Sequence, residues 1–270
     1  MSLQKEQKIN QLLQLWKPHT VFTQKWLEEK YYSRQLLKLY VKSHWLEKVG
    51  HGAYIRAGDT LSWEGALYSL QQQLQLPLHL GGKTALQLLG KAHYVTFQSD
   101  KQIIELYSHG LDKRMIIPKW FLGQKWANTI RVHRSNCFSN NEIGLQSEKI
   151  ADNSFSLLIS SPERAMLEFL ADVPEVASVE EGFYLMEGMG SLRPELVQQL
   201  LEHCTSVKAK RLFLLLAEHF NHAWFEMIDM SAISLGKGKR KIGVGGKYYP
   251  KYLVSIPPLP ADSPNLEDIP

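Results

Sequence analysis

A chain of 270 residues with 44% hydrophobic and 10% aromatic content is too long for a single DNA-binding module, and it can form the cores of two globular domains. The net charge of +4 excludes a uniformly basic protein, and Cys137 and Cys204 lie too far apart in sequence to indicate a disulfide framework or a zinc site. The first residues lack the apolar core of a signal peptide, and no stretch approaches the ~20 apolar residues of a membrane span. The sequence therefore predicts a cytoplasmic protein with no membrane partner.

The charges are unevenly distributed along the chain. Residues 1–58 hold ten basic and four acidic side chains, residues 59–205 hold twelve and seventeen, and residues 206–252 hold nine and three. Two segments of net charge +6 thus flank an acidic middle of −5. This pattern indicates an anionic partner that binds at particular places on the protein.

Residues 1–58 predict three helices followed by a β-hairpin. An amphipathic helix spans residues 3–16, Thr23 caps a second helix, and Ser33 caps a third. Two predicted strands, residues 45–49 and 53–56, flank a glycine-containing turn. We predict a winged helix-turn-helix DNA-binding domain over residues 1–58, because this order and size are typical of that module.

The third helix carries a basic stripe. Arg34, Lys38 and Lys42 are four residues apart, and Gln35 lies beside them on a face away from the apolar positions. Such a stripe is often an ordinary solvated helix face. Its place directly before a hairpin favours a recognition helix that contacts DNA.

Residues 59–256 predict a second domain of mixed α+β class. Its helices begin after Ser62, at Thr84, after Ser161 and near residues 193 and 207, and its strands are predicted at 78–80, 94–97, 103–107, 130–133, 155–159, 239–244 and 252–256. The helices and strands do not alternate regularly, which favours α+β over a doubly wound fold. Residues 257–270 form a proline-rich acidic tail.

Several motifs in the second domain are incomplete. Gly82-Lys83-Thr84 is similar to the end of a P-loop, but Pro77 stands where that motif needs glycine. His219 and His222 lack the further ligands that zinc requires, and Ser161 is a helix-capping residue without a nucleophile elbow. The sequence therefore predicts no catalytic residue, no metal and no cofactor, with a nuclease-like domain as the enzymatic alternative.

The second basic segment contains two groups of cations. Lys208, Lys210 and Arg211 open a predicted helix, where the helix dipole disfavours positive charge, so an anionic surface inside or outside the protein is expected nearby. The glycine-rich loop that follows carries Lys237, Lys239, Arg240 and Lys241. This loop is either a phosphate-binding surface or a solvated hairpin.

Four ordered stretches resemble the AbiEi antitoxins of bacterial type IV toxin-antitoxin systems, which are abortive-infection proteins of phage defence. They read LLKLYVKSHWLEKVGHGAYIRAGD, HLGGKTALQLLGKAHYV, ISSPERAMLEFLADVP and SVKAKRLFLLLAEHFNHAWFEMIDMSAISLGKGKRKIGVGGKYYPKYLVSIP. The resemblance covers nearly the whole chain up to Ile256, and none of its stretches is a strict motif.

The resemblance implies a non-enzymatic transcriptional repressor and antitoxin. Its N-terminal winged helix would bind inverted repeats in its own promoter, and its second domain would neutralise a nucleotidyltransferase-like toxin without a stable complex. Carried over by position, the helix residues would face the DNA groove and the hairpin residues would lie on the wing. The predicted DNA-binding residues are Ser33, Arg34, Gln35, Lys38, Lys42, His51 and Arg56, and a second basic surface would contain Lys208, Lys210, Arg211, Lys237, Lys239, Arg240 and Lys241.

Three alternatives remain open at this level. The protein is a solitary DNA-binding regulator, a nucleic-acid enzyme with a nuclease-like second domain, or an interaction protein whose basic C-terminal segment grips a toxin or RNA. The sequence specifies neither the operator nor the oligomeric state.

Overall fold

The computed structural model of this protein describes residues 2–92, 102–110, 115–134, 137–150 and 154–260, with side chains described from residue 7 onward. It has the mixed α+β composition that the sequence predicts. The strand predicted at residues 94–97 and most of the predicted tail lie outside the described residues. No helix within the described ranges is long and apolar enough to span a membrane.

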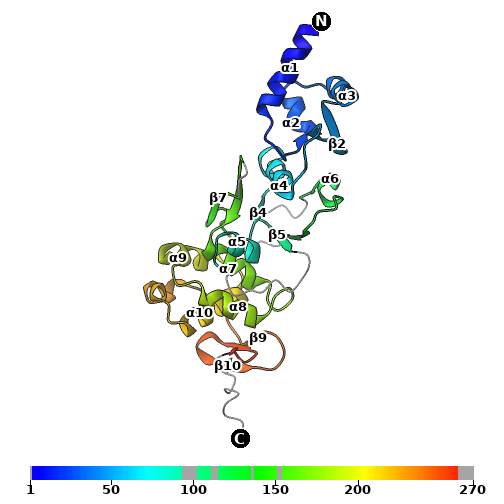
Figure 1. Cartoon of the computed structure of the whole chain (residues 1–270). Helices are drawn as coiled ribbons and strands as arrows, with labels where there is room; N and C mark the ends of the chain where they lie inside the picture. Colours follow the sequence, from blue (N-terminus) through cyan, green and yellow to red (C-terminus); the bar gives the residue numbers. More distant parts are fainter. Residues whose placement is uncertain (1, 93–101, 111–114, 135–136, 151–153, 261–270) are drawn as a thin grey trace. The chain divides into compact units, whose positions relative to one another are not determined.

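The predicted order of three helices and a hairpin is present at the N-terminus (Figure 1). The helices are α1 (Ser2–Leu15), α2 (Gln24–Glu29) and α3 (Arg34–Lys42), and the strands are β1 (Phe22–Thr23), β2 (Leu46–Gly50) and β3 (Ala53–Arg56). Thr23 Oγ1 accepts a hydrogen bond from Trp26 N, and Ser33 Oγ accepts one from Leu36 N. Both predicted caps therefore start their helices.

These elements enclose their own hydrophobic core. β1 pairs with β3, which pairs with β2, so a third strand joins the predicted hairpin. The buried side chains of this core are Ile9, Leu12, Trp16, Phe22, Leu27, Tyr32, Leu37, Tyr40, Leu46 and Tyr54. Packing of Leu37 and Tyr40 fixes the rotation of α3, and the opposite side of that helix faces solvent.

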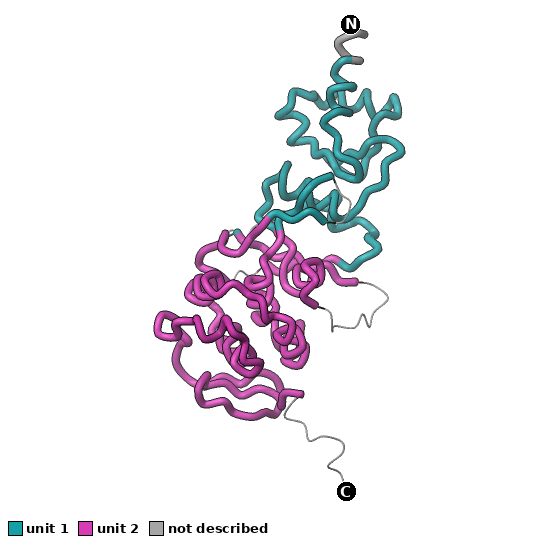
Figure 2. The backbone as a smooth tube through the Cα atoms, turned by 60° about the vertical axis from the view of Figure 1, so that its left-hand side comes forward, with its two compact units in different colours: residues 1–78, 110–129, 147–158 teal, residues 79–109, 130–146, 159–270 magenta. Residues whose placement is uncertain are grey.

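The chain divides into two compact units, each built from several separate segments of the sequence. Unit 1 contains residues 1–78, 110–129 and 147–158, and unit 2 contains residues 79–109, 130–146 and 159–270 (Figure 2). Helix α4 (Trp63–Gln72) belongs to unit 1 because side chains at its C-terminal end bind β1 and the residue before it. Ser69 and Gln73 both hydrogen-bond to the backbone of Val21, and Gln73 Oε1 also accepts from Thr23 N at 2.8 Å. These bonds satisfy backbone groups at the edge of the small sheet.

The remaining helices and strands form two further sheets with their covering helices. One sheet has the order β6-β5-β4-β8-β7 and the other has the order β10-β11-β9. The strands are β4 (Leu78–Leu80), β5 (Ile103–Ser108), β6 (Thr129–His133), β7 (Leu145–Lys149), β8 (Ser156–Ser160), β9 (Arg240–Lys241), β10 (Lys247–Tyr249) and β11 (Val254–Ile256). The helices are α5 (Gly82–Leu88), α6 (Lys119–Leu122), α7 (Pro162–Ala171), α8 (Val179–Glu187), α9 (Pro194–His203), α10 (Val207–His219), and the 3-10 helices η1 (Ala223–Met227), η2 (Met230–Ala232) and η3 (Pro250–Tyr252).

Helix α7 is the centre of unit 2. It packs against α5, α8, α9 and α10, which surround its label in Figure 1. Ser161 caps it and Pro162 is its first residue, as predicted. Because neighbours cover most of α7, its polar side chains Glu163, Arg164 and Glu168 are also buried and must find partners inside the unit.

Candidate nucleic-acid interface

The predicted DNA-binding residues of α3 lie on its exposed side. Ser33, Arg34, Gln35, Lys38 and Lys42 are all exposed. Within the described ranges, neither Lys38 nor Lys42 has an ion-pair partner, so both ammonium groups can meet an external anion. Among these cations lies Leu39, whose side chain is 38% exposed. We did not single out Leu39 from the sequence, although its spacing from Gln35 and Lys42 places it on their face.

Arg34 is bound by a neighbouring helix. Its Nε donates to Glu28 Oε1 at 2.6 Å, and Gln24 Nε2 donates to the same oxygen at 2.9 Å. The Arg34 hydrogen bond lowers the pKa of Glu28. The Arg34 side chain is still 71% exposed, so the pair is open to competition by another acceptor. Glu28 is the second residue of this surface that we did not single out from the sequence.

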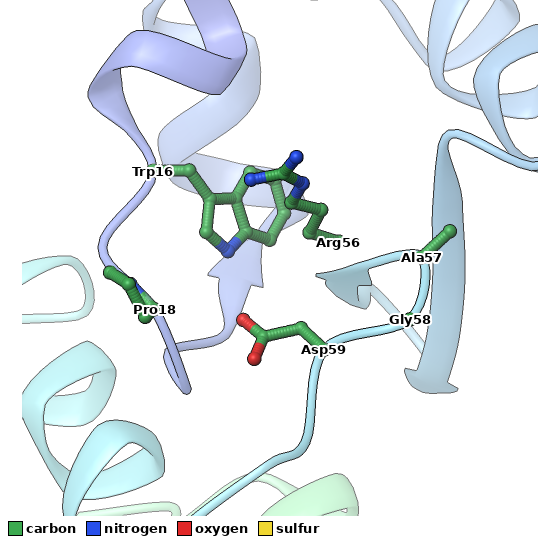
Figure 3. A pocket seen from close by; sticks show the side chains of 6 residues that line it. All are labelled: Trp16, Pro18, Arg56, Ala57, Gly58 and Asp59. Atoms are coloured by element: carbon green, nitrogen blue, oxygen red, sulfur yellow. The ribbon is translucent and has the colours of Figure 1, made fainter.

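The predicted hairpin residues His51 and Arg56 are also exposed. Arg56 lines a pocket of about 240 Å³ together with Trp16, Pro18, Ala57, Gly58 and Asp59 (Figure 3). The Asp59 carboxylate is held by His19, whose backbone N donates to Oδ2 at 2.9 Å. This contact fixes the chain where it leaves the hairpin.

The three cations predicted at the start of a helix, Lys208, Lys210 and Arg211, have different surroundings in the structure. Lys208 Nζ donates to Glu175 Oε2 at 3.0 Å, so an exposed carboxylate of the same unit pairs with it at the surface. Lys210 is only 4% exposed, and Arg211 is fully buried. Lys210 and Arg211 therefore lie in the interior and do not contribute an exposed surface.

Arg211 instead holds the glycine-rich loop. Its Nε donates to Leu235 O at 3.0 Å, its Nη1 donates to Gly238 O at 2.8 Å and Leu253 O at 2.9 Å, and its Nη2 donates to Gly236 O at 3.3 Å. One guanidinium thus binds four backbone carbonyls, three from the loop and one, Leu253 O, from the residue before β11. The cations that this loop leaves exposed are Lys237, Lys239, Arg240 and Lys241.

A buried carboxylate organises the polar interior of unit 2. Glu168 Oε1 accepts from His79 Nε2 and from Arg164 Nε, both at 2.8 Å, and Oε2 accepts from Ser160 Oγ at 2.8 Å. Burial alone would raise the pKa of Glu168, but His79 and Arg164 outweigh it and lower the pKa to about 2. Burial lowers the pKa of His79, so a neutral imidazole donates to an ionised Glu168.

A second group of buried polar side chains surrounds His133. Its Nδ1 lies 2.9 Å from Asp172 Oδ2, which also accepts from the Tyr107 hydroxyl at 2.7 Å, and the rings of Tyr107 and His133 stack with centroids 4.1 Å apart. Burial would lower the pKa of His133, but Asp172 and Glu105 raise it to about 9. His133 is therefore a cation held between two carboxylates.

Two carboxylates, those of Glu168 and Glu105, accept hydrogen bonds from backbone amides at the start of α5. Gly82 N donates to Glu168 Oε2 at 3.3 Å, and Lys83 N donates to Glu105 Oε2 at 3.1 Å. Gly82 has a positive φ of 50°, and an added Cβ would lie 2.5 Å from the Tyr107 hydroxyl. The N-cap is Gly81 and not the predicted Thr84, whose hydroxyl instead accepts from Glu105 N at 2.9 Å. Internal acids thus fill the place where a P-loop would hold phosphate.

The acids and histidines of the described residues form no group of three or more that could hold a metal ion. Glu163, for example, receives three hydrogen bonds from Arg193 at 3.0 Å. In these contacts Glu163 and Glu168 serve as ion-pair partners of basic side chains within unit 2.

Two family models together cover most of the chain. Residues 5–97 match the model described as "Transcriptional regulator, AbiEi antitoxin N-terminal domain", and residues 102–257 match the one described as "Transcriptional regulator, AbiEi antitoxin, Type IV TA system". No curated protein matches the chain.

The fold is similar to that of known solved structures. The crystal structure of RV2827C protein from Mycobacterium tuberculosis matches with 13% sequence identity and a TM-score of 0.55, over 87% of this chain and 85% of that chain. At this identity the likeness concerns the fold alone.

Proposed function

This chain belongs to the AbiEi family of antitoxins and transcriptional regulators of type IV toxin-antitoxin systems, and we propose that it represses its own operon by binding inverted repeats through α3. The observation that carries the proposal is the exposed face of α3, where Lys38 and Lys42 have no ion-pair partner within the described residues. The three helices and the hairpin have the order of a winged helix, in which the third helix enters the major groove.

The residues of this face suit different parts of a DNA duplex. Lys38 and Lys42 can neutralise phosphates, which sets affinity on any sequence. Arg34 and Gln35 can hydrogen-bond to base edges, and Leu39 can contact the methyl group of thymine. His51 and Arg56 on the hairpin lie where the wing of such a module contacts the DNA backbone.

The family also suggests a second role for the chain. We propose that it neutralises a nucleotidyltransferase-like toxin without a stable complex, and that this activity resides in the part matched by the family model over residues 102–257. The exposed loop cations Lys237, Lys239, Arg240 and Lys241 are the second basic surface of this proposal.

Base reading by Arg34 is tested by comparing operator DNA with random DNA. We expect Arg34→Ala to weaken operator binding about 10-fold and to leave binding to random DNA nearly unchanged, since a bidentate arginine contact to guanine contributes about 1–3 kcal/mol of discrimination. The ion pair between Arg34 and Glu28 offsets part of this binding free energy, because Arg34 must break its hydrogen bond with Glu28 before it can bind a base. Fluorescence anisotropy with both DNAs measures the effect.

Glu28→Gln is the matched control for this experiment. It keeps the shape of the side chain and removes the charge that competes for Arg34, so operator binding should tighten severalfold. Equal weakening of Arg34→Ala on both DNAs would assign Arg34 to the phosphate backbone and contradict base reading.

Repression and neutralisation are separable in the full chain. We expect the Lys38→Ala/Lys42→Ala variant to lose promoter repression and to keep rescuing growth when the neighbouring toxin gene is co-expressed. Truncation at residue 59 is unsuitable because it would separate α4 from the backbone of Val21 that it binds. If the variant loses rescue together with repression, neutralisation depends on DNA binding and our division of roles is wrong.

A further inference from the structure

A pocket of unit 1 lies where the chain leaves the hairpin. It has a volume of about 240 Å³, which is roughly eight water molecules at about 30 Å³ each. This volume is below the usual range of about 300–1,000 Å³ for sites of drug-sized ligands, so the pocket suits a smaller molecule. Its lining residues are Trp16, Pro18, Arg56, Ala57, Gly58 and Asp59 (Figure 3).

The indole nitrogen of Trp16 is buried and lacks a hydrogen bond. Trp16 is only 8% exposed, and its Nε1 has no hydrogen-bond partner among the described residues. The ring packs on Phe22 with centroids 3.9 Å apart, which fixes the direction of the N–H. Figure 3 shows the ring nitrogen on the side of the indole that faces Asp59. An indole N–H can only donate, and a buried donor without an acceptor is costly, so a bound acceptor would stabilise this site.

Two opposite charges line the same pocket. Arg56 is exposed, and its guanidinium has no hydrogen-bond or ion-pair partner in the part of the chain that the structure describes. The Asp59 carboxylate is held by two backbone donors, His19 N to Oδ2 at 2.9 Å and Thr60 N to Oδ1 at 2.8 Å. A carboxylate offers about four acceptor sites, so Asp59 can still bind a further donor. The pocket therefore favours a ligand with both charges, because a simple anion would meet Asp59 and a simple cation would meet Arg56.

The wall that carries Asp59 is fixed to β2 and to the residue before it. Ala57 N donates to Trp45 O at 3.0 Å, and Gly58 N donates to Glu47 Oε1 at 3.0 Å. Gly58 has a positive φ of 77°, which glycine adopts without strain. The pocket is thus largely formed before a ligand arrives.

We propose that this pocket binds a small zwitterion of the amino-acid class, with the ligand carboxylate on Arg56 and Trp16 Nε1 and its ammonium on Asp59. A guanidinium and a second N–H donor match a carboxylate through charge-assisted hydrogen bonds. Pro18 and Ala57 provide apolar surface for an aliphatic side chain. The ordinary alternative is a hydrated hollow in which water accepts from Trp16 Nε1, and such a hollow would not distinguish a zwitterion from an anion.

The test is a titration of the full chain without DNA, followed by the indole N–H resonances of protein labelled with ¹⁵N-tryptophan. The chain has seven tryptophans, and Trp16→Phe identifies the resonance of Trp16. The probe is L-leucine, and its matched controls are 4-methylpentanoate, which lacks the ammonium, and 3-methylbutylamine, which lacks the carboxylate. We expect L-leucine to shift the Trp16 resonance downfield with half-saturation at about 1 mM or below, and each control to bind at least about 10-fold more weakly.

Substitutions in the pocket test the role of each charge. Arg56→Gln and Asp59→Asn each remove one charge at similar size, and each should weaken L-leucine binding about 10-fold. Arg34→Gln is the matched control, because it removes an exposed arginine of unit 1 outside the pocket and should leave the titration unchanged. The comparison of the three compounds uses wild-type protein, so it decides the question even if Asp59→Asn does not fold.

Two results would overturn the proposal. One is a Trp16 resonance that L-leucine does not move at concentrations up to about 10 mM. The other is an equal shift with 4-methylpentanoate or inorganic phosphate, which would make the pocket a general anion site that a DNA phosphate could also occupy. Because the titration contains no DNA, a failure of α3 to bind DNA would leave this result unaffected.

Discussion

Glu168→Ala should lower the free energy of unfolding by about 3–5 kcal/mol, the range for breaking a buried ion pair from one side. The substitution leaves the buried Arg164 guanidinium without its carboxylate, and it removes the acceptor of His79 and Ser160. Gly82 N at the start of α5 would lose its acceptor as well. The loss is large because these groups are buried, so leaving them without a partner costs their full desolvation penalty.

Urea denaturation followed by far-UV circular dichroism measures this effect. Glu175→Ala is the matched control, because Glu175 is an exposed carboxylate paired with Lys208 and should change stability by less than about 1 kcal/mol. A Glu168→Ala protein within about 1 kcal/mol of wild type would contradict the role of Glu168.

The difference in unfolding free energy between wild type and Glu168→Ala should also depend on pH, which provides a second check. The pKa of Glu168 is lowered from 4.5 to about 2, so its stabilising effect is fully present above pH 4.5 and is lost as the pH falls through about 2. The difference between wild type and Glu168→Ala should therefore stay constant from pH 7 to pH 5 and shrink below pH 4.5.

The Lys38→Ala/Lys42→Ala variant should bind promoter DNA about 30-fold more weakly than wild type near 0.15 M salt. Each lysine that neutralises a phosphate releases about 0.9 counterions. At this salt concentration that release raises the affinity for DNA about fivefold per lysine. The loss should be similar on operator and random DNA, because phosphates carry no sequence information.

Lys8→Ala/Lys25→Ala is the matched control for that variant. It also removes two exposed lysines of unit 1, and these lie on α1 and α2, outside α3 and the hairpin. A loss of affinity as large in the control as in Lys38→Ala/Lys42→Ala would mean that general positive charge, and not the face of α3, drives binding.

Local signals in the sequence predicted most of the helices and the exposed basic face. Ser33 and Ser161 are side-chain caps next to amphipathic runs, and the spacing of Leu37 and Tyr40 fixed which side of α3 would be buried. Helix α8 was missed although its signal is present, since Ser178 caps it and Glu181 follows at the position of a capping box. Strand β7 carries no such signal, because only its first residue, Leu145, is apolar and none of its residues is buried.

Contacts between distant residues could not be predicted from local patterns. The division of the chain depends on how Ser69 and Gln73 bind Val21, and burial of Arg211 depends on a loop more than twenty residues away. The sequence shows that Lys208, Lys210 and Arg211 are cations at a helix start. It does not show that Lys208 meets a carboxylate, that Lys210 is buried, or that Arg211 binds a set of carbonyls.

A salt titration tests our central claim, that the exposed face of α3 binds DNA, most directly. The affinity of the full chain for its promoter fragment is measured by anisotropy between 50 and 300 mM salt, for wild type and for Lys38→Ala/Lys42→Ala. The logarithm of the affinity should fall linearly with the logarithm of salt concentration, and the slope of the variant should be smaller by roughly two units. An identical slope for the two proteins would show that neither lysine meets a phosphate and would contradict the claim.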